Sequence, residues 1–460
     1  MRVEKLQARG GMLMLYRKAQ EVIEHWIHKG NDALLVQGAR QTGKTFLIRD
    51  ILSSWGDYVE FNFIESPQLV TLFKTASSAE DLLRRFSVAS GRPLNAGKTI
   101  IFLDEVQECE DVVTWIKFLV EEGSYRYILS GSLLGIELKD IRSAPVGSMQ
   151  IVDMFPMDLE EFFIAIGIRQ DTLDLIRKHY SDRSSIDTYI HQRLLDAYYL
   201  YLITGGMPEA VQTYVDSNDL SRVAEVHEKI TRLYKLDFVK YEEKNKLKLR
   251  EIYDAIPGEL EEKNKRFFIN HIDGKTGYDK VRDDFLWLKS AGVALPVYNV
   301  TEPMNPLAVS EKRNLFKLFL SDVGLLTNRY PASVRFQLLN KERGIKNGGL
   351  FENAVAQELY AKGFHVYYYN SKRQGELDFV IELNGNVLPI EVKSGKDYKR
   401  HQALNNVINT ESNRIPEAIV FHDGNVEHEG RILYLPIYMM MCIRDDMPES
   451  MIYKLDLEGI

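Results

Sequence analysis

The chain has 460 residues and a formal net charge of −8 at neutral pH, and 45% of its residues are hydrophobic. This length is typical of about three domains, and the hydrophobic content is enough to bury their cores. Two cysteines far apart in the chain exclude a disulfide framework and a cysteine metal motif, which indicates a reducing, cytoplasmic environment. The longest apolar stretch, residues 434–443, is about half a membrane span, so a membrane protein is not expected.

Residues 1–14 are expected to form an N-terminal extension outside the folded domains. Their beginning is polar and has no signal-peptide pattern, and Met12 or Met14 could be the true start of the protein. The folded part is expected to begin at Leu15 and to reach its first strand at residues 33–36.

A phosphate-binding loop follows this first strand. Residues 38–45 read Gly-Ala-Arg-Gln-Thr-Gly-Lys-Thr, which is the G-x-x-x-x-G-K-[ST] pattern. The glycines let backbone amides turn toward phosphate oxygens, Lys44 brings positive charge, and the hydroxyl of Thr45 is a ligand for Mg²⁺. The helix that begins near Lys44 adds its positive end. The expected nucleotide-binding residues are Gly38, Ala39, Arg40, Gln41, Thr42, Gly43, Lys44 and Thr45.

A second predicted strand carries the acids that a nucleotide site needs. The apolar run 99–103 indicates a buried parallel strand, and it ends in Asp104 and Glu105. We expect Asp104 to hold Mg²⁺ through water and Glu105 to orient the attacking water. The sequence therefore predicts ATP hydrolysis, with Glu105, Asp104 and Lys44 as catalytic residues, rather than ATP binding alone.

Further strands complete a sheet. Residues 125–129 are followed by Ser130 and Ser132, whose hydroxyls can hydrogen-bond the γ-phosphate or the attacking water. Strands at 58–63 and 149–154 alternate with segments of helical pattern. This alternation predicts an α/β domain in which helices cover both faces of a parallel sheet.

Two helical regions are expected next. Residues 158–241 have apolar faces at helical spacing and are predicted to form a lid, with the Gly-Gly-Met-Pro-Glu segment 205–209 as a turn near the nucleotide. Helices at 247–256 and 278–290 and a hairpin of strands 294–300 and 315–320 have the order of a winged helix, which often reads DNA. Residues 245–330 carry 14 Lys or Arg against 12 Asp or Glu, however, so a structural spacer is an equal alternative.

The tail holds a second constellation of charged residues. A predicted hairpin places Asp378, Glu391 and Lys393 near one end, and Glu391 and Lys393 point to one face because they are two apart on a strand. Glu352, on a preceding helix, is expected to lie close enough to share a cation. Such acids and an ammonium can hold Mg²⁺ and activate water for phosphodiester attack, but residues 345–460 carry 12 Lys or Arg against 17 Asp or Glu, which disfavours loose DNA binding.

The loop 38–45, the strand ends Phe-Leu-Asp-Glu-Val-Gln and Leu-Ser-Gly-Ser, and the segments 155–162 and 205–209 resemble prokaryotic AAA+ ATPases of the archaeal-type, STAND-related branch. More narrowly, the chain resembles members with a C-terminal DUF4143-like domain of unknown function related to the PD-(D/E)xK nuclease fold. The resemblance implies an α/β protein with an AAA+ P-loop core, a helical lid, a winged helix and a restriction-endonuclease-like tail. The expected divisions are 1–14, 15–157, 158–244, 245–335 and 340–460.

One departure from this family concerns an arginine that reaches a neighbour's γ-phosphate. The resemblance implies a Gly-Arg pair before Phe155, but the matching positions are Gly147 and Ser148. Either Arg142 substitutes or an arginine in trans is absent. AAA+ cores commonly complete their site from a neighbour, so ATP-dependent self-association is expected.

Two functions compete on this evidence. The first is an Mg²⁺-dependent ATPase that acts as a motor or switch on nucleic acid through its nuclease-like tail. The second is an ATP-gated switch whose inert tail binds a protein partner. DNA-stimulated ATP turnover would separate them.

Overall fold

Five strands of the N-terminal lobe form one parallel sheet. The computed structural model describes residues 15–132, 147–245, 248–262, 264–268, 278–342, 348–395, 397–445 and 454. In this part of the chain the first sheet has the order β2-β3-β4-β1-β5, and all of its pairs are parallel. Its strands are β1 (Ala33–Gln37), β2 (Tyr58–Asn62), β3 (Ile100–Asp104), β4 (Arg126–Gly131) and β5 (Met149–Asp153).

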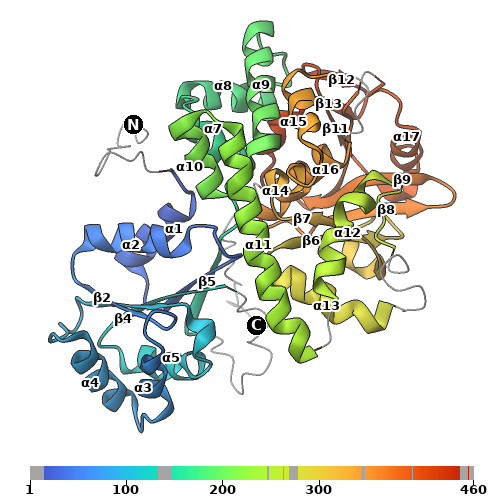
Figure 1. Ribbon diagram of the computed structural model, residues 1–460. Coiled ribbons are helices and arrows are strands. Elements are labelled where there is room, and N and C mark those ends of the chain that lie inside the picture. Colours follow the sequence, from blue (N-terminus) through green and yellow to red (C-terminus); the bar gives the residue numbers. More distant parts are fainter. Residues whose placement is uncertain are drawn as a thin grey trace, which may run out of the picture.

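Helices cover both faces of this sheet, as the alternation of strands and helices predicts (Figure 1). One face packs against α1 and α2, and the other against α3, α4 and α5. The central strand β3 is buried along its whole length, because its apolar side chains contact helices on both sides. The predicted α/β core with a parallel sheet is therefore confirmed. The helices are α1 (Ala19–Lys29), α2 (Lys44–Trp55), α3 (Val70–Lys74), α4 (Ala79–Ser90) and α5 (Asp111–Glu122).

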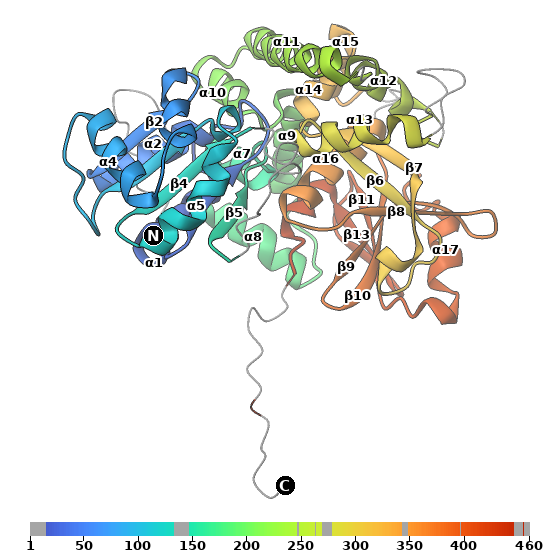
Figure 2. The ribbon, with the colours of Figure 1, turned by 90° about the horizontal axis from the view of Figure 1, so that it is seen from below.

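A helical region follows the first sheet, where the lid is expected. It begins at Asp158, whose side chain and that of Glu161 form a capping box at the start of α7. The longest helix, α11, has 26 residues and lies along the junction of the two lobes (Figures 1 and 2). The helices are α7 (Leu159–Ala165), α8 (Gln170–Ser181), α9 (Thr188–Thr204), α10 (Pro208–Ser217) and α11 (Leu220–Asn245). Within the described residues, every helix is too short or too polar to span a membrane.

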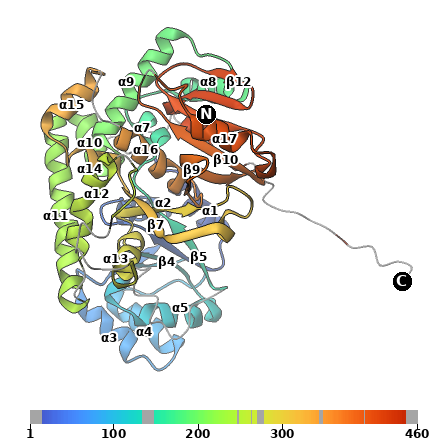
Figure 3. The ribbon, with the colours of Figure 1, turned by 90° about the vertical axis from the view of Figure 1, so that its right-hand side faces the viewer.

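The second lobe is built on a mixed sheet. Among the described residues it has eight strands in the order β12-β13-β11-β10-β9-β8-β6-β7. Helix α16 (Gly348–Ala361) packs on one face and α17 (Gln402–Ile408) on the other (Figure 3). The strands are β6 (Ala294–Val300), β7 (Glu311–Leu320), β8 (Tyr367–Ser371), β9 (Gly375–Leu383), β10 (Asn386–Val392), β11 (Ala418–His422), β12 (Glu427–Glu429) and β13 (Ile432–Pro436).

The hairpin expected as the wing of a winged helix belongs to this second sheet. Its strands β6 and β7 pair with each other, and β6 also pairs in parallel with β8. The strand pairing therefore places the hairpin in the second sheet and not in a separate winged-helix domain that ends near residue 335. Helices α12 (Leu249–Glu261) and α13 (Tyr278–Ser290) precede the hairpin, as expected. The physical reason is that β6 is buried along almost its whole length, so a hydrogen-bonded neighbour on each edge satisfies its backbone.

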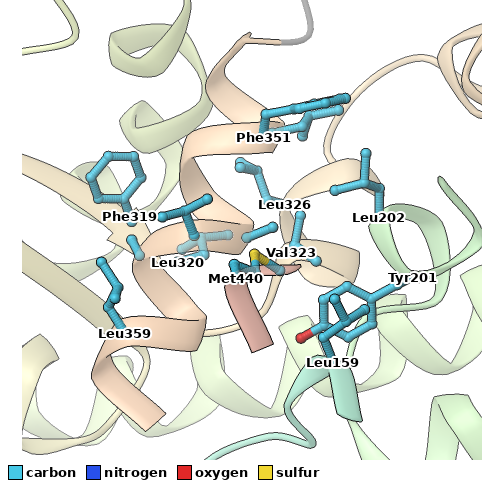
Figure 4. Close-up of a cluster of buried hydrophobic side chains, with 14 of the residues drawn as sticks. Leu159, Tyr201, Leu202, Phe319, Leu320, Val323, Leu326, Phe351, Leu359 and Met440 are labelled. Carbon is cyan, nitrogen blue, oxygen red and sulfur yellow. The ribbon is translucent and has the colours of Figure 1, made fainter. Parts of the chain in front are cut away.

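Helices α7 and α9 and the second sheet share one hydrophobic core. Figure 4 shows side chains from α7 and α9 packed with others from β7, α14 (Val323–Thr327), α16 and the 3₁₀ helix η8 (Ile437–Cys442). The labelled residues are Leu159, Tyr201, Leu202, Phe319, Leu320, Val323, Leu326, Phe351, Leu359 and Met440. Because this core is continuous, α7 and α9 are packed as one unit with the second sheet.

A buried carboxylate fixes the turn between α9 and α10 to this shared core. Asp322 accepts hydrogen bonds from the backbone nitrogens of Gly206, at 2.6 Å, and Leu325, at 2.9 Å. At Gly206 the backbone passes so close to the segment before α7 that a Cβ would lie 2.0 Å from the carbonyl oxygen of Met157. This position therefore requires glycine.

We expect Asp322→Ala to lower the free energy of unfolding of the second lobe by about 2–4 kcal/mol, because two buried N–H groups lose their acceptor. Asp187 is a matched control, since it caps α9 but is exposed; Asp187→Ala should cost about 1 kcal/mol or less. Urea unfolding followed by tryptophan fluorescence measures both. Equal losses for the two variants would show that burial adds nothing to the Asp322 cap.

Candidate functional site

The predicted phosphate loop joins β1 to α2, which begins at Lys44. Gly43 has φ of 87°, in the left-handed region that glycine adopts without strain. At Gly38 a Cβ would lie 2.2 Å from the carbonyl oxygen of Met154 on the neighbouring segment. Both glycines are thus required by the path of the loop, and α2 directs its N-terminus at the space that the loop encloses.

Lys44 lies across the loop. Its ammonium donates to the carbonyl oxygens of Gly38, at 3.0 Å, and Ala39, at 2.7 Å. Burial lowers the pKa of Lys44 to about 8, although the carboxylates of Glu105 and Asp104 act to raise it. Phosphate oxygens would supply the negative charge that favours the protonated form.

Asp104 is the centre of the predicted Mg²⁺ position. It is fully buried and accepts hydrogen bonds from the hydroxyl of Thr45, at 3.0 Å, the hydroxyl of Ser130, and the side-chain amide of Asn62, at 2.8 Å. A hydroxyl and a carboxylate side by side are hard oxygen ligands, and Mg²⁺ is usually held by one or two such groups together with phosphates and water. The residues present therefore fit this cation. The sequence reasoning missed Asn62, which ends the strand paired with β3.

Glu105 directly follows Asp104 and has a left-handed backbone, with φ of 58°. Its carboxylate accepts a hydrogen bond of 2.6 Å from the side-chain amide of Gln107. The oxygen of that amide accepts a bond of 3.2 Å from the backbone nitrogen of Ser132. Gln107, which the sequence reasoning also missed, thus links Glu105 to the end of β4 and fixes its orientation.

Among the described residues, several segments outside the first sheet contact the loop. Arg17, which is buried, donates to the carbonyl oxygen of Thr42 at 2.8 Å and pairs with Glu161 of α7 at 3.2 Å. Arg40 pairs with Asp237 of α11 at 2.8 Å. A third contact comes from the 205–209 turn, since a Cβ on Gly43 would lie 3.6 Å from Cγ of Pro208. These contacts were not visible in the sequence, because their partners are far apart in the chain.

Ser148 occupies the position where the family resemblance implies a trans-acting arginine. Ser148 precedes β5 and its carbonyl oxygen accepts a hydrogen bond from the nitrogen of Ala33. Arg142 lies outside the described residues.

The four predicted tail residues lie around one end of β9 and β10. Lys393 and Glu391 form an ion pair of 2.5 Å, and the carboxylate of Asp378 accepts a 2.9 Å bond from the nitrogen of Val392. Glu352 projects from α16 and is buried. Burial and, after it, the charge of Asp378 raise the pKa of Glu391 to about 8.

Two further lysines enter this tail cluster, and the sequence reasoning missed both. Lys317 of β7 is only 1% exposed; its ammonium lies 3.0 Å from Glu376, 3.7 Å from Glu352 and 4.0 Å from Asp378. Lys265 pairs with Glu352. No sequence signal marks Lys317, because it looks like the solvent-facing residue of an edge strand.

The lysines change what the tail cluster can do. Over the described residues, no three His, Cys, Asp or Glu side chains are arranged to hold a metal ion. The ammonium of Lys317 instead provides positive charge among the carboxylates. In this arrangement Glu352 and Asp378 face an internal cation.

Three family models match parts of the chain. Residues 30–163 match the AAA domain, residues 195–333 match a domain of unknown function (DUF8612), and residues 347–440 match a domain of unknown function (DUF4143). No curated protein matches the chain.

Solved structures give weak similarities. A Walker-type ATPase of Pyrococcus abyssi is 14% identical, with 71% of this chain and 99% of that chain covered and a TM-score of 0.42. The ORC1 protein of Aeropyrum pernix in complex with DNA is 15% identical, with coverages of 71% and 91% and a TM-score of 0.27. A STAND protein with a tetratricopeptide repeat sensor from Pyrococcus horikoshii is 12% identical, with coverages of 78% and 50% and a TM-score of 0.24. These scores are too low to support a conclusion on fold or function. The family matches do support a conclusion. The chain carries an AAA domain followed by two domains of unknown function, and the AAA domain implies binding of ATP with Mg²⁺.

Proposed function

We propose that the protein is an Mg²⁺-dependent ATPase that acts as a switch, in which the nucleotide state of the loop is passed to the second lobe. The observation that carries this proposal is the buried Asp104, which Thr45, Ser130 and Asn62 hold beside Lys44 and Glu105. This set can bind a triphosphate and position a water, which are the two requirements for phosphoryl transfer to water.

The roles follow from the geometry. The amides of the loop and the ammonium of Lys44 bind the β- and γ-phosphates, and Thr45 and Asp104 would hold the cation. When bound, Mg²⁺ neutralises phosphate charge and orients the γ-phosphate. Glu105, oriented by Gln107, accepts a hydrogen bond from the attacking water and aligns it with the γ-phosphorus.

A continuous set of contacts supports the transfer of this state to the second lobe. Arg17 connects the loop to Glu161 in α7. The nitrogen of Leu159, at the start of α7, donates to the carboxylate of Glu358 at 3.0 Å, and Glu358 belongs to α16, the central helix of the second lobe. A displacement of the loop would therefore act on the helix that also carries Glu352.

The role of the tail is the second part of the proposal. The order of α16, β9 and β10 and the Glu391-x-Lys393 spacing support a relation to the restriction-endonuclease fold. The buried Lys317 favours an inert tail that serves as a binding platform, with a protein as the partner more readily than DNA, since the tail is acidic. A live nuclease site remains the competing proposal, and ATP-dependent self-association remains a prediction.

For the nucleotide site, we expect Lys44→Ala to weaken ATP affinity at least about 10-fold, because the ammonium offsets phosphate charge before and during the reaction. Glu105→Gln should bind ATP within about twofold of wild type and lose at least about 100-fold in turnover, because Glu105 acts only on the water. Calorimetry and phosphate release measure these quantities, with the exposed Lys29→Ala as control. Unchanged ATP affinity in Lys44→Ala would refute the site.

For the tail, we expect no Mg²⁺- or Mn²⁺-dependent cleavage of single-stranded, duplex or branched DNA above the level of an Asp378→Ala, Glu391→Ala double variant. The reason is that the ammonium of Lys317 lies beside Glu352 and Asp378, two of the acids that would share a metal ion. Gel assays over a range of both metals test this. Cleavage by wild type that the double variant lacks would establish a nuclease.

The same cluster generates a stability prediction. Lys317→Ala should destabilise the second lobe by about 3–5 kcal/mol, because it leaves buried carboxylates without their cation. Lys312 lies on the same strand but is exposed, so Lys312→Ala should change the stability by less than about 0.5 kcal/mol. Denaturant unfolding compares the two. A loss of under about 1 kcal/mol for Lys317→Ala would mean that the carboxylates take up protons instead.

A further inference from the structure

Arg40, the third residue of the phosphate loop, is attached to α11 at two points. Its carbonyl oxygen accepts a hydrogen bond of 3.1 Å from the hydroxyl of Tyr234. Its guanidinium pairs with Asp237 at 2.8 Å. Tyr234 and Asp237 are three residues apart, so they lie on the same face of the helix, and that face is the one turned to the loop.

The guanidinium of Arg40 also lies beside the residues that surround a γ-phosphate. Its Nε is 3.5 Å from the hydroxyl of Ser132. The nitrogen of Ser132 is bonded to Gln107, which holds Glu105. The charge of Arg40 contributes to the lowered pKa of Lys44, so the two cations act on the same space.

The ion pair with Asp237 is partly open to exchange. The side chain of Arg40 is 28% exposed and that of Asp237 is 8% exposed. Burial raises the pKa of Asp237, while Arg40 acts to lower it and Glu105 and Glu108 act to raise it. A phosphate group offers the guanidinium more negative charge than this carboxylate and can accept two parallel hydrogen bonds.

We propose that Arg40 supplies, from within the same chain, the arginine that stabilises the γ-phosphate during hydrolysis, and that Asp237 holds it on α11 until ATP binds. The proposal rests on the ATPase function proposed above and adds a residue to it. It also accounts for the serine at position 148, where the family resemblance implies an arginine, because a site with an arginine from its own chain does not need one from a neighbour.

The reaction itself stays an in-line displacement. The oxygen of the water forms the new bond to the γ-phosphorus, and the bond from that phosphorus to the β–γ bridging oxygen breaks with its electron pair left on ADP. The proton of the water passes by way of Glu105 to phosphate or solvent. Arg40 donates hydrogen bonds to the γ-phosphate oxygens as they become P–O groups of inorganic phosphate.

Exchange of partners gives α11 a nucleotide-dependent contact. With the γ-phosphate present, the guanidinium of Arg40 leaves Asp237 and this ion pair between the loop and α11 is lost, while the hydrogen bond from Tyr234 to the carbonyl oxygen of Arg40 remains. After hydrolysis and phosphate release the ion pair forms again. ADP, which lacks the γ-phosphate, leaves the pair intact.

Turnover and affinity test the catalytic part. We expect Arg40→Ala to lower turnover at least about 1,000-fold, the lower end of arginine-finger effects, while ADP affinity stays within about twofold. Arg40→Lys should recover less than a tenth of the activity, because an ammonium lacks the planar fork. Asp237→Asn should tighten ATP binding several-fold without a change for ADP. Arg232→Ala, on the exposed side of α11, is the control and should match wild type.

A label on α11 tests the exchange of partners. Leu236, next to Asp237, is 61% exposed, and both native cysteines are buried, so Leu236→Cys can be labelled selectively with an environment-sensitive fluorophore. A non-hydrolysable ATP analogue should change the signal and ADP should not. In the Arg40→Ala background the analogue should give no change, although intact ADP affinity shows that the loop is folded.

The outcomes separate this proposal from the ATPase function. If the wild type hydrolyses ATP and the turnover of Arg40→Ala is within about threefold of the wild-type turnover, the role of Arg40 is overturned and the ATPase function stands. Absence of ATP binding by wild type would overturn both. If the ATP analogue still changes the fluorescence of the label in Arg40→Ala, the proposed exchange of partners between Asp237 and the γ-phosphate is refuted.

Discussion

The buried carboxylate of Asp104 is the constraint on which the nucleotide site depends. It receives hydrogen bonds from α2, β2 and β4, through Thr45, Asn62 and Ser130. An ionised group without access to water is tolerated only when such donors surround it. The ends of three neighbouring strands and the start of α2 are therefore fixed relative to one another before any ligand binds, and this preorganisation lowers the cost of positioning phosphates and a cation.

A second constraint joins the helical region after the first sheet to the tail. Helices α7 and α9 bury their apolar faces against α14, α16 and η8, so they share one core with the second sheet. Among the described residues, the contacts between the first lobe and this unit include ion pairs, such as Arg17 with Glu161 and Arg40 with Asp237. Packed apolar cores shift as rigid bodies, whereas ion pairs can exchange partners. The response to the nucleotide is therefore expected to be concentrated at these contacts.

The sequence predicted the first lobe well for a physical reason. Its strands are short apolar runs next to a loop whose residue types are dictated by phosphate chemistry, so local pattern and function agree. The structure places Lys44, Thr45, Asp104, Glu105, Ser130 and Ser132 around one end of the first sheet. By contrast, Asn62, Gln107 and Asp237 were missed because their roles depend on contacts across strand ends and between lobes. No local pattern marks such contacts.

The second lobe shows where local pattern misleads. The helices and the hairpin follow one another in winged-helix order, and this local order predicts a separate domain that includes the hairpin. Strand β6 of this hairpin pairs with β8, which is far along the chain, and the burial of β6 decides this pairing. That pairing is also what carries Lys317 into the cluster of acids. One long-range pairing therefore changed both the domain division and the chemistry of the tail.

The tail cluster has a consequence for any activity there. Among the described residues, Glu352, Glu376, Asp378 and Glu391 meet three lysines, Lys265, Lys317 and Lys393, which leaves one carboxylate in excess. The raised pKa of Glu391, about 8, is consistent with a proton that balances this excess near neutral pH. A divalent cation would have to displace both that proton and the ammonium of Lys317, and β7, which carries Lys317, packs against α14 and α16 in the shared core. A metal ion in the tail would therefore compete with the buried ammonium of Lys317 for the same carboxylates.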